Sequence, residues 1–446
     1  MRLFANVAFT AAPSLPWAQS ALMDSARREN IPAHGTRIAA VASVIVSMAL
    51  TAVGNGLLFT YIPVRLGAEG FPPLWAGAIL TGLSAGGLAG CLLTGAIVRR
   101  VGHARSYMLF TALIVLANAI VALRVDPVIW IFARALYGFT ISALFIVAQS
   151  WLNDAVGNAV RGRVMAIFYV SYIVGLGVGA FLLGFADIGS AEAPILAIVF
   201  TACSILPVGL TRLAQPPPPE SASVALAKAW RISPVGVAGM LAVGGLSMLI
   251  SGFAPIHVTA KGFSQQEVAM LMSAMPLGTL LLQIPFGWIS DRTDRRYVLI
   301  ATSMLVVLMG FAALHFDGAT LLVVIAVYMI WGGASESIYS LSSAHANDRA
   351  SKKDLVTLSS SMLFAWSISG LIAPGLGTVL TVLYGTQSFI HVAIAVAAAF
   401  CAFVFWRVLR VPPVPQDDTG TFAPMSAQAP PAVDLAFPAD GETPRR

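Results

Sequence analysis

Long apolar stretches follow one another along most of the chain, with short polar segments between them. Twelve of these stretches have the composition of transmembrane helices, each of which needs about 20 residues to cross a bilayer. They contain many helix-forming residues and Gly, and they lack the apolar–polar alternation of membrane strands, which excludes a β-barrel. The pattern therefore predicts an all-α integral membrane protein. The predicted spans are 38–62, 74–98, 107–123, 127–150, 163–186, 193–212, 234–257, 267–290, 297–315, 319–342, 356–382 and 388–406.

The second half of the chain repeats Gly, Pro and charged positions of the first half. At an offset of 192 residues Pro63 matches Pro255, Gly70-Phe71 matches Gly262-Phe263, Gly95 matches Gly287 and Arg100 matches Arg292; at an offset of 194 Gly138 matches Gly332 and Asn153-Asp154 matches Asn347-Asp348. Each copy holds an even number of spans, six, so both copies have the same orientation in the membrane. Parallel repeats of this kind place a binding site between the halves, where rocking exposes it to either side. The repeat predicts a carrier.

The same pattern divides the chain into five segments. These are a disordered cytoplasmic tail (1–36), a six-helix bundle (37–213), a cytoplasmic linker (214–233), a second six-helix bundle (234–410) and a disordered cytoplasmic tail (411–446). The linker contains the run Pro216–Pro219, and residues 412–446 are rich in Pro, Ala and Asp, which is typical of disorder. The stretch after Arg2 resembles a weak signal peptide, but Arg27 and Arg28 argue against cleavage, and both Met1 and Met23 are candidate starts.

Charge sets the expected orientation. Only 10% of the residues are charged and 58% are hydrophobic, whereas a soluble domain carries about 25% charged residues. Of the 26 Lys and Arg residues, Arg65, Arg124 and Lys261 lie in loops on one side, Arg134 lies inside a span, and the remaining 22 lie on the other side. The positive-inside rule then predicts a multi-pass protein of the inner (plasma) membrane with both termini in the cytoplasm. The net charge of +6 reports this topology, not a nucleic-acid partner.

The sequence does not indicate an enzyme or a metal site. Cys91, Cys203 and Cys401 all fall inside predicted spans, without metal-ligand spacing or a disulfide framework. Asp, Glu and His are scattered along the chain. We therefore predict no catalytic residue, no metal and no cofactor, and we expect a monomer in the lipid bilayer.

The loop after the eighth span reads GWISDRTDRR over residues 287–296. It resembles motif A of the major facilitator superfamily, G-x-x-x-D-R-x-G-R-[RK], with Asp294 in place of the second Gly. The Gly lets two helices approach closely, and Asp291 is expected to face a neighbouring helix N-terminus and nearby Arg groups, as a latch that breaks when the carrier rocks. The first copy keeps both glycines but has Arg99 where the acid belongs; the alternative is that these are ordinary basic loop charges. The candidate gate residues are Gly95, Arg99, Arg100, Gly102, Gly287, Asp291, Arg292, Arg295 and Arg296.

The fourth span contains RALYG over residues 134–138, which resembles the R-x-x-x-G of motif B in the same superfamily. A buried guanidinium is costly, so Arg134 is expected to face the bundle interior and meet carbonyls, an acid or an anionic substrate. The resemblance associates this Arg with proton-linked transport. Because Arg134 lies about two helical turns from the outer end of the span, the alternative is a side chain that extends to the membrane interface.

Glu336, in the tenth span, is the carboxylate that lies well inside a predicted span. An intramembrane acid that alternates between protonated and ionised forms is a natural group for proton coupling. Its repeat-equivalent in the fourth span is Ser142, so the acid is present in one half only. A hydrogen bond between helices, or contact with water in the inner vestibule, is the alternative role.

Other polar and aromatic residues lie on the pathway spans. The resemblance to the superfamily implies that spans one, four, seven and ten surround the pathway, which nominates Asn55, Tyr137 and Trp331, and Gln149 is a further candidate. For each residue the alternative role is packing. Spans five and eleven carry a Gly-rich pattern that resembles motif C of proton antiporters without its Pro in span five, and we expect it to serve packing and gating. These residues are Gly175, Gly179, Gly370, Pro374 and Gly375.

Two stretches resemble the YcaD-like branch of the superfamily. One is RALYG at 134–138, followed by QSWLN at 149–153 and RGR at 161–163; the other is AHANDR at 344–349, followed by APGLG at 373–377. That branch usually has Glu where this chain has Gln149. If relatives use that Glu for coupling, this chain uses another group or none.

The expected function is secondary active transport of a small molecule across the inner membrane by alternating access, with protons as the coupling ion. The small number of fixed charges in the spans favours an amphipathic or neutral substrate, such as a drug-like molecule that is exported. The alternatives are an uptake carrier for a sugar or an organic acid, and a non-transporting membrane sensor on the same fold. The sensor is disfavoured because both tails are short, and a membrane-embedded enzyme is disfavoured further.

Overall fold

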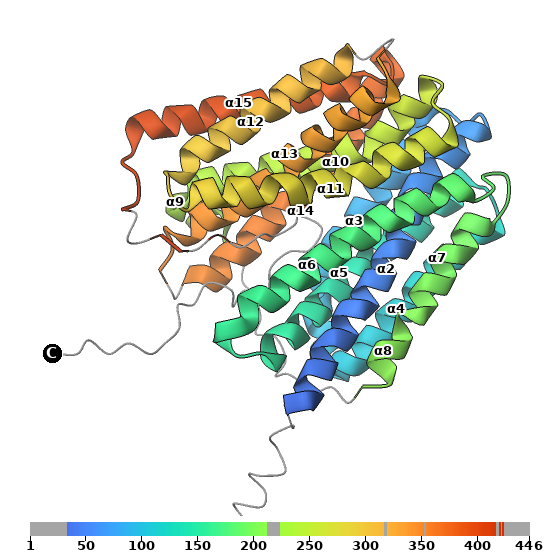
Figure 1. Cartoon of the computed structure of the whole chain (residues 1–446), viewed down its shortest axis with the longest axis horizontal. Coiled ribbons are helices and arrows are strands. Elements are labelled where there is room, and N and C mark those ends of the chain that lie inside the picture. Colours follow the sequence, from blue (N-terminus) through green and yellow to red (C-terminus); the bar gives the residue numbers. More distant parts are fainter. Residues whose placement is uncertain are drawn as a thin grey trace, which may run out of the picture.

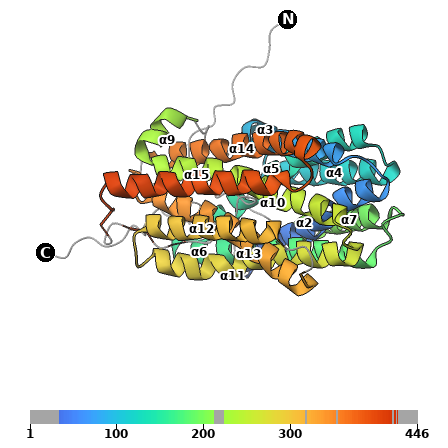
Figure 2. The same ribbon diagram turned by 90° about the horizontal axis from the view of Figure 1, so that it is seen from above.

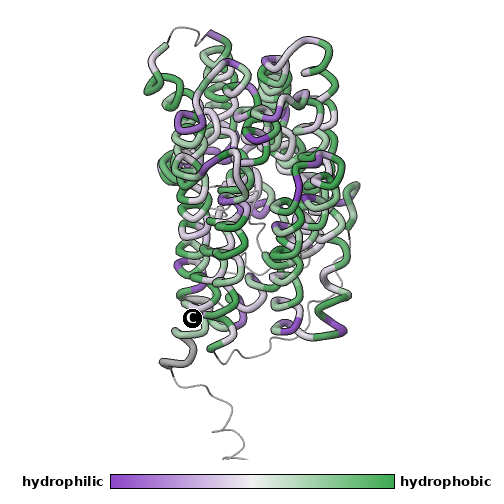
Figure 3. Tube along the Cα trace, turned by 90° about the vertical axis from the view of Figure 1, so that its right-hand side faces the viewer, coloured by the Kyte–Doolittle hydropathy of each residue, from purple (hydrophilic) through white to green (hydrophobic). Residues whose placement is uncertain are grey.

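The computed structural model describes residues 34–211, 224–315, 319–351, 354–415, 419, 420 and 422. Within these residues the protein is helical and contains no strand. Twelve helical segments are long and apolar enough to cross a membrane, which confirms the predicted all-α membrane fold. Hydrophobic residues run along most of each long helix (Figure 3), and large apolar side chains such as Phe132 and Leu322, which are 72% and 76% exposed, cover the outer face.

The long helices follow the predicted spans closely. In the first half they are α2 (His34–Ala68), α3 (Pro73–Val101), α4 (His103–Leu123), α5 (Pro127–Ala155), α6 (Asn158–Leu182), and the pair α7 (Glu192–Cys203) and α8 (Ile205–Gly209). In the second half they are α10 (Pro234–Ala260), α11 (Gln265–Ser290), α12 (Arg295–Leu314), α13 (Leu321–Asn347), α14 (Leu355–Tyr384) and α15 (Ser388–Arg410). A short 3-10 helix, η1 (Leu183–Phe185), extends α6, and α9 (Leu226–Ile232) precedes α10. The predicted starts at Met1 and Met23 and the Pro216–Pro219 run lie outside the described residues.

The helices form two bundles side by side, one from α2–α8 and one from α10–α15 (Figure 1). Each bundle crosses the membrane an even number of times, so α2 begins and α15 ends at the same end of the molecule. We call this the terminal end (His34 and Arg410) and the opposite end the distal end (Ala68 and Ser388). The repeat detected in the sequence is thus a repeat of helical bundles.

Small residues let helices within each bundle approach one another. A Cβ atom on Gly179 of α6 would overlap the carbonyl oxygen of Val53 on α2, and a Cβ on Gly278 of α11 would overlap that of Met329 on α13. Membrane helices gain stability from such close packing, because lipid supplies no hydrophobic drive for helix association. The Gly-rich spans are therefore the inner contact helices of their bundles.

The repeated Gly-Phe pair forms a tight turn at the distal end in both halves. Gly70 and Gly262 have φ angles of 74° and 89°, in the left-handed region that favours Gly. In the second half, Ser264 then starts α11 with a capping box, in which its side chain accepts from the backbone of Glu267 and the Glu267 side chain accepts in return. The shared turn explains why these glycines recur at a fixed offset.

The two bundles meet at the distal end. Gly77 of α3 packs on Thr378 of α14, and Gly252 of α10 packs on Leu80 of α3. The side chain of Gln265 on α11 donates hydrogen bonds to the carbonyl oxygens of Leu183 (2.5 Å) and Ala186 (2.6 Å), which follow α6. From this contact the ribbons of α6 and α11 diverge toward the terminal end in Figure 1, and Figure 2 shows the same helices from above.

Candidate functional site

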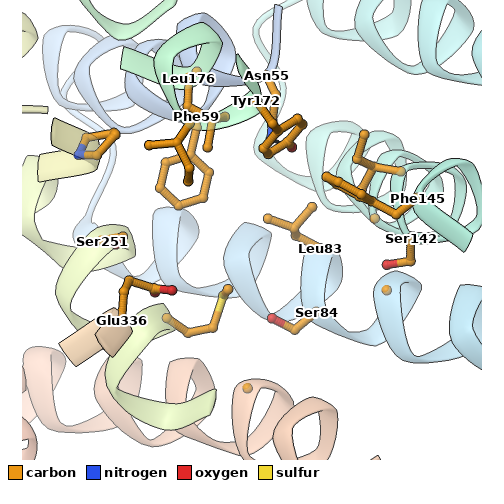
Figure 4. A pocket seen from close by; sticks show the side chains of 18 of the residues that line it. Asn55, Phe59, Leu83, Ser84, Ser142, Phe145, Tyr172, Leu176, Ser251 and Glu336 are labelled. Atoms are coloured by element: carbon orange, nitrogen blue, oxygen red, sulfur yellow. Dashed lines mark hydrogen bonds between the residues drawn. The ribbon is translucent and has the colours of Figure 1, made fainter. Parts of the chain in front are cut away.

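A cavity lies between the two bundles, at mid-depth of the helices. It encloses about 1350 Å³ of space between atoms, which includes the part open to solvent. Helices α2, α3, α5 and α6 form its first-half wall, and α10, α11, α13 and α14 form its second-half wall. Figure 4 shows side chains of both walls pointing into this space.

The two walls are made of equivalent positions of the repeat. At an offset of 192 residues Gly56 matches Met248, Phe59 matches Ser251, Leu83 matches Met275 and Gly87 matches Thr279; at an offset of 194 Gly138 matches Gly332, Ser142 matches Glu336, Tyr172 matches Trp366 and Leu176 matches Gly370. Both members of each pair line the cavity. The cavity therefore lies where the two halves face each other through the same surface, as expected for a site between parallel repeats.

The first-half wall is aromatic with one amide. Asn55 of α2 donates from its side-chain nitrogen to the Tyr172 hydroxyl on α6 at 3.3 Å, while its side-chain oxygen is buried without a hydrogen-bond partner. The Tyr172 ring packs edge-on against Phe145, with ring centroids 4.6 Å apart. This wall offers aromatic surface and one unused acceptor to a bound molecule.

Glu336 is the acidic side chain among the described residues that line the cavity. It is 8% exposed, and the Ser247 hydroxyl on α10 donates a hydrogen bond to its carboxylate. The side chain of Gln283 on α11 donates to the Glu336 backbone carbonyl at 3.5 Å. The carboxylate is thus held between helices while it faces the cavity (Figure 4).

Arg134 is buried beside the cavity but is not part of its lining. Its side chain is 2% exposed, and its guanidinium carbon lies 4.1 Å from the centre of the Tyr137 ring, which does line the cavity. One guanidinium nitrogen, Nη1, is buried without a hydrogen-bond partner. The guanidinium therefore remains inside the bundle, and Tyr137 separates it from the central space.

The remaining pathway candidates lie apart from the cavity lining. Trp331 packs against Tyr328 and Phe389, with ring centroids 5.7 Å and 6.0 Å away, inside the second bundle. Gln149 is buried in α5, nearer the terminal end than the lining residues of that helix. Of the six pathway residues named from the sequence, the structure brings Asn55, Tyr137 and Glu336 to the cavity.

Sequence reasoning did not single out Tyr172 or the methionines of the second-half wall. Met248, Met272 and Met275 line the cavity opposite the aromatic wall. Apolar residues inside a span give no sign of which face they occupy. The repeat offset does give a sign for Tyr172, because its equivalent is Trp366, an aromatic residue that also lines the cavity.

The second-half motif A residues form a charged cluster at the terminal end. Arg295 is 3% exposed and donates to Asp348 at 2.6 Å, to Ser290 at 2.9 Å and to Asp291 at 3.3 Å. The other partner of the Asp291 carboxylate is the backbone N–H of Phe422, at 2.8 Å. The expected contact with a neighbouring helix N-terminus is thus replaced here by a contact with the chain beyond α15.

Arg296 and Asp294 form a second pair in this cluster. Arg296 donates to Asp294 at 2.6 Å and to the Val411 carbonyl at 2.7 Å. Burial alone would raise the pKa of Asp294, but the hydrogen bonds and charge of Arg296 outweigh it and hold that pKa below its ordinary value. Asp294 also caps α12 by accepting from the Arg296 backbone, which explains an acid where motif A has Gly. Arg292 lies outside the pair and stacks on Trp288, 4.0 Å from the ring centre.

The first-half copy of motif A is built differently. Arg99 and Arg100 are exposed in the last turn of α3, and Gly102 ends that helix with a φ of 83°. Within 4 Å of a Cβ on Gly95 lies only the Arg99 side chain, among the described residues. The charged cluster thus belongs to the second half, as the substitution of Arg99 for the acid suggested.

The glycines expected to pack helices fall into two groups. Gly175 and Gly179 of α6 lie against the backbone of α2, where any side chain would collide. Gly370 of α14 has ordinary contacts, and a Cβ on Gly375 would meet no atom of the described residues within 4 Å. Pro374 lies inside α14, and its carbonyl accepts from Thr378 at 2.7 Å.

Comparison with known proteins identifies the class that this fold and cavity define. The family model of the Major Facilitator Superfamily matches residues 44–236 and 235–436, so the chain belongs to this superfamily of membrane transporters. The uncharacterized MFS-type transporter YcaD of Shigella flexneri is 24% identical over 364 residues, which cover 81% of this chain and 92% of YcaD. An MFS-type transporter of Yersinia pestis is 25% identical over 373 residues, 82% of this chain and 94% of that protein. The resemblance to the YcaD-like branch is therefore confirmed.

Solved structures support the fold. The nucleoside transporter NupG has a TM-score of 0.64 and 13% identity, and the match covers 84% of this chain and 100% of that chain. A POT family transporter in complex with 5-aminolevulinic acid has a TM-score of 0.67 and 14% identity, over 83% of this chain and 96% of its own. At these identities the likeness shows the shared transporter fold.

Proposed function

We propose that the protein is a secondary active transporter that moves a small molecule across the inner membrane by alternating access. The observation that carries this proposal is the central cavity, whose two walls are equivalent surfaces of the two halves. Residues 37–213 and 234–410 would rock against each other around this cavity and expose it to each side in turn. Residues 1–36 and 411–446 would be tails, and 214–233 the linker between the moving units.

The described conformation would be the one open toward the terminal end. The contacts of Gln265 and Gly77 join the halves at the distal end, while α6 and α11 diverge toward the terminal end. The excess of Lys and Arg on the terminal side supports a cytoplasmic location for that end. The cavity would then face the cytoplasm. The gate at Gly287, Asp291 and their neighbours would be open in this conformation and would close in the next step of the cycle.

Glu336 would couple the movement of substrate to that of protons. Its carboxylate faces the cavity from α13 and accepts from Ser247 on α10, so its ionisation state affects both the bound molecule and the contact between helices. Protonation would remove the negative charge from the cavity before the halves close around it. Gln149 on α5 does not ionise, which supports a coupling group on the second half.

The substrate would be an amphipathic, drug-like molecule that is exported. Its apolar body would contact Phe59, Phe145 and Tyr172 on one wall and the methionines on the other. Methionine and aromatic side chains adapt to apolar ligands of different shapes. A hydrogen-bonding or positively charged group would bind Glu336 and compete with the proton for it.

An organic acid taken up by the cell is the second candidate. The observation that favours it is Arg134, a buried guanidinium with an unpartnered Nη1 behind the Tyr137 ring. If a ligand displaced that ring, the Arg134 guanidinium would become accessible from the cavity as a cationic hydrogen-bond donor. Uptake of a sugar, and a non-transporting sensor on the same fold, remain alternatives without a comparable structural observation in their favour.

The test is transport into proteoliposomes with an imposed pH gradient, screened over organic cations, neutral amphipathic molecules, sugars and organic acids. The proposal expects gradient-driven movement of a cationic or neutral amphipathic compound. Movement that ignores the gradient would remove proton coupling, and movement of organic acids alone would favour the second candidate. Absence of any transport and of any binding to the purified protein across these classes would count against a transporter.

Orientation has a separate test. A single cysteine at residue 104, in the first turn of α4 at the terminal end, should be labelled by an impermeant reagent only after the cells are opened. Labelling from outside intact cells would reverse the proposed topology.

A further inference from the structure

The chain beyond α15 returns to the charged cluster at the terminal end. The Phe422 N–H donates to Asp291 at 2.8 Å, the Gly420 N–H donates to Asp348 at 3.0 Å, and Arg295 donates to the Gly420 carbonyl. The ring of Phe422 lies directly on Gly287, at a position that a Cβ on this glycine would overlap. Gly420 and Phe422 therefore have a specific binding site made of the glycine, the acid and the Arg of motif A, together with Asp348.

This binding site lies on the face of α11 that meets the first half of the protein. At the distal end Ala269 of α11 approaches Gly184 of η1, and Ser273 of α11 approaches Gly177 of α6. Helical residues advance by about 100° each, because a turn takes 3.6 residues. Asp291 is 18 residues beyond Ser273, which corresponds to five whole turns, so it projects in the same direction.

Closure at the terminal end requires this face. If the two halves rock about the distal contact, the terminal parts of α6 and α11 approach each other, and the surface around Gly287 and Asp291 must become available to α6. In the described conformation Phe422 covers that surface. The backbone N–H of Phe422 also donates a hydrogen bond to the Asp291 carboxylate. The tail contact and the closed gate exclude each other.

We propose that the described part of the chain beyond α15 (residues 411–415, 419, 420 and 422) is an intramolecular wedge, which binds motif A of the second half and holds the terminal end open until it is released. Arg296 anchors the start of the segment through the Val411 carbonyl, and Asp291, Arg295 and Asp348 hold its end. The wedge goes beyond the proposed transport function, because it requires two conformations but no particular substrate. It gives the C-terminal tail a role in setting the balance between them.

The experiment measures the distance across the terminal end without any substrate. Spin labels are placed at Arg105 on α4 and Tyr297 on α12, in a full-length chain whose native cysteines are replaced; both side chains are exposed, and neither is among the residues that bind the wedge. Phe422→Ala, and truncation after Pro415, should each raise the ratio of short to long distances roughly fivefold to tenfold, since each removes buried contacts of the open state alone. An unchanged distance distribution in both variants would overturn the wedge.

Gly287→Ala separates the wedge from a general effect on packing. The added methyl group overlaps the Phe422 ring, but it also lies on the face that α6 must reach in the closed gate. The effect is therefore compared between two backgrounds: relative to the unsubstituted chain, the substitution should raise the fraction of short distances more in the full-length chain than in the truncated one. In the chain truncated after Pro415 the ring is absent, and the substitution should not raise it. The same shift in both backgrounds would show that Gly287 acts without the tail, and would overturn the proposal. Because the readout is a distance, a failure to find transport would leave this result unaffected.

Discussion

The Ser247 hydroxyl on α10 donates a hydrogen bond to the Glu336 carboxylate on α13, at the wall of the central cavity. The repeat-equivalent residues in the first half are Asn55 and Ser142, which carry no acid. Asn55 instead hydrogen-bonds Tyr172 on α6. Two symmetric halves thus present different chemistry to the same cavity, and the ionisable group belongs to the second half.

Glu336→Gln should abolish transport driven by a pH gradient while sparing exchange of substrate across the membrane. The amide keeps the size of the side chain and still accepts from Ser247, but it does not bind and release a proton. The measurement compares gradient-driven uptake or efflux with exchange in the same proteoliposomes. Ser142→Ala, at the equivalent position of the other wall, is the matched control and should retain driven transport. Driven transport that survives Glu336→Gln would remove Glu336 from the coupling mechanism.

Arg134→Met should raise the thermal stability of the protein and lower its transport activity. Replacing even a buried ion pair by apolar residues of similar volume is often neutral or stabilising by about 1–4 kcal/mol, and Nη1 of the buried Arg134 has no hydrogen-bond partner to lose. Transport should fall because the guanidinium beside Tyr137 is lost. The two quantities are measured by thermal unfolding in detergent and by proteoliposome transport. Arg134→Lys, which keeps the charge, is the control; full activity in both variants would indicate a structural role for this side chain.

The arrangement of the helices could be predicted from the sequence because it follows from local properties. Span length and apolar composition define each helix, and the recurrence of Pro63 as Pro255 and of Gly70 as Gly262 defines the two halves. The turn glycines are informative since their positive φ angles leave little choice of residue. These signals depend on a few neighbouring positions only.

The site could be predicted only in part, because it depends on which face of each helix meets the other half. Trp331 and Tyr137 lie on pathway spans in the sequence, but the first packs inside its bundle and the second lines the cavity. No periodicity separates these faces when both are apolar. The contact of Phe422 with Asp291 could not be predicted for a related reason. It joins residues 131 positions apart, and the tail carries no sequence motif that indicates it.

Gly179→Ala should destabilise the protein strongly, whereas Gly375→Ala should leave it nearly unchanged. The new methyl group on α6 would overlap the Val53 carbonyl of α2, while the one on α14 meets no described atom within 4 Å. Overpacking of this kind costs about 1–3 kcal/mol or more, and a Gly-to-Ala change in open helix favours the helix by up to about 1 kcal/mol. Thermal unfolding of both variants in the same detergent checks this. Equal melting temperatures would show that α2 and α6 separate readily.

Asp294→Asn should destabilise the protein at neutral pH and lose this effect in acid. The carboxylate is 13% exposed and pairs with Arg296 at 2.6 Å, and a hydrogen bond to a charged group contributes about 1.5–3 kcal/mol. Because the pKa of Asp294 is lowered in the folded protein, its contribution is complete above the ordinary Asp value of about 3.9 and disappears as the pH falls through the lowered value. Stability of wild type and variant is compared from pH 7 downward. A difference that stays constant to the lowest pH would assign the effect to packing.

Gln265→Ala should shift the protein toward a conformation that is open at the distal end. The Gln265 side chain donates to the carbonyl oxygens of Leu183 and Ala186 in the other half, at 2.5 Å and 2.6 Å. Both bonds cross the contact about which the halves meet, so their loss weakens the distal seal while each bundle keeps its own packing. The measurement is the rate at which an impermeant thiol reagent modifies a cysteine placed at Ser273, which lies behind this contact against Gly177. The rate should rise several-fold, since two hydrogen bonds contribute about 1 kcal/mol each, whereas Met270→Ala, at a side chain of the same helix that is 42% exposed, should leave it unchanged. An equal rate in all three proteins would mean that apolar contacts such as Gly77 with Thr378 close the distal end by themselves.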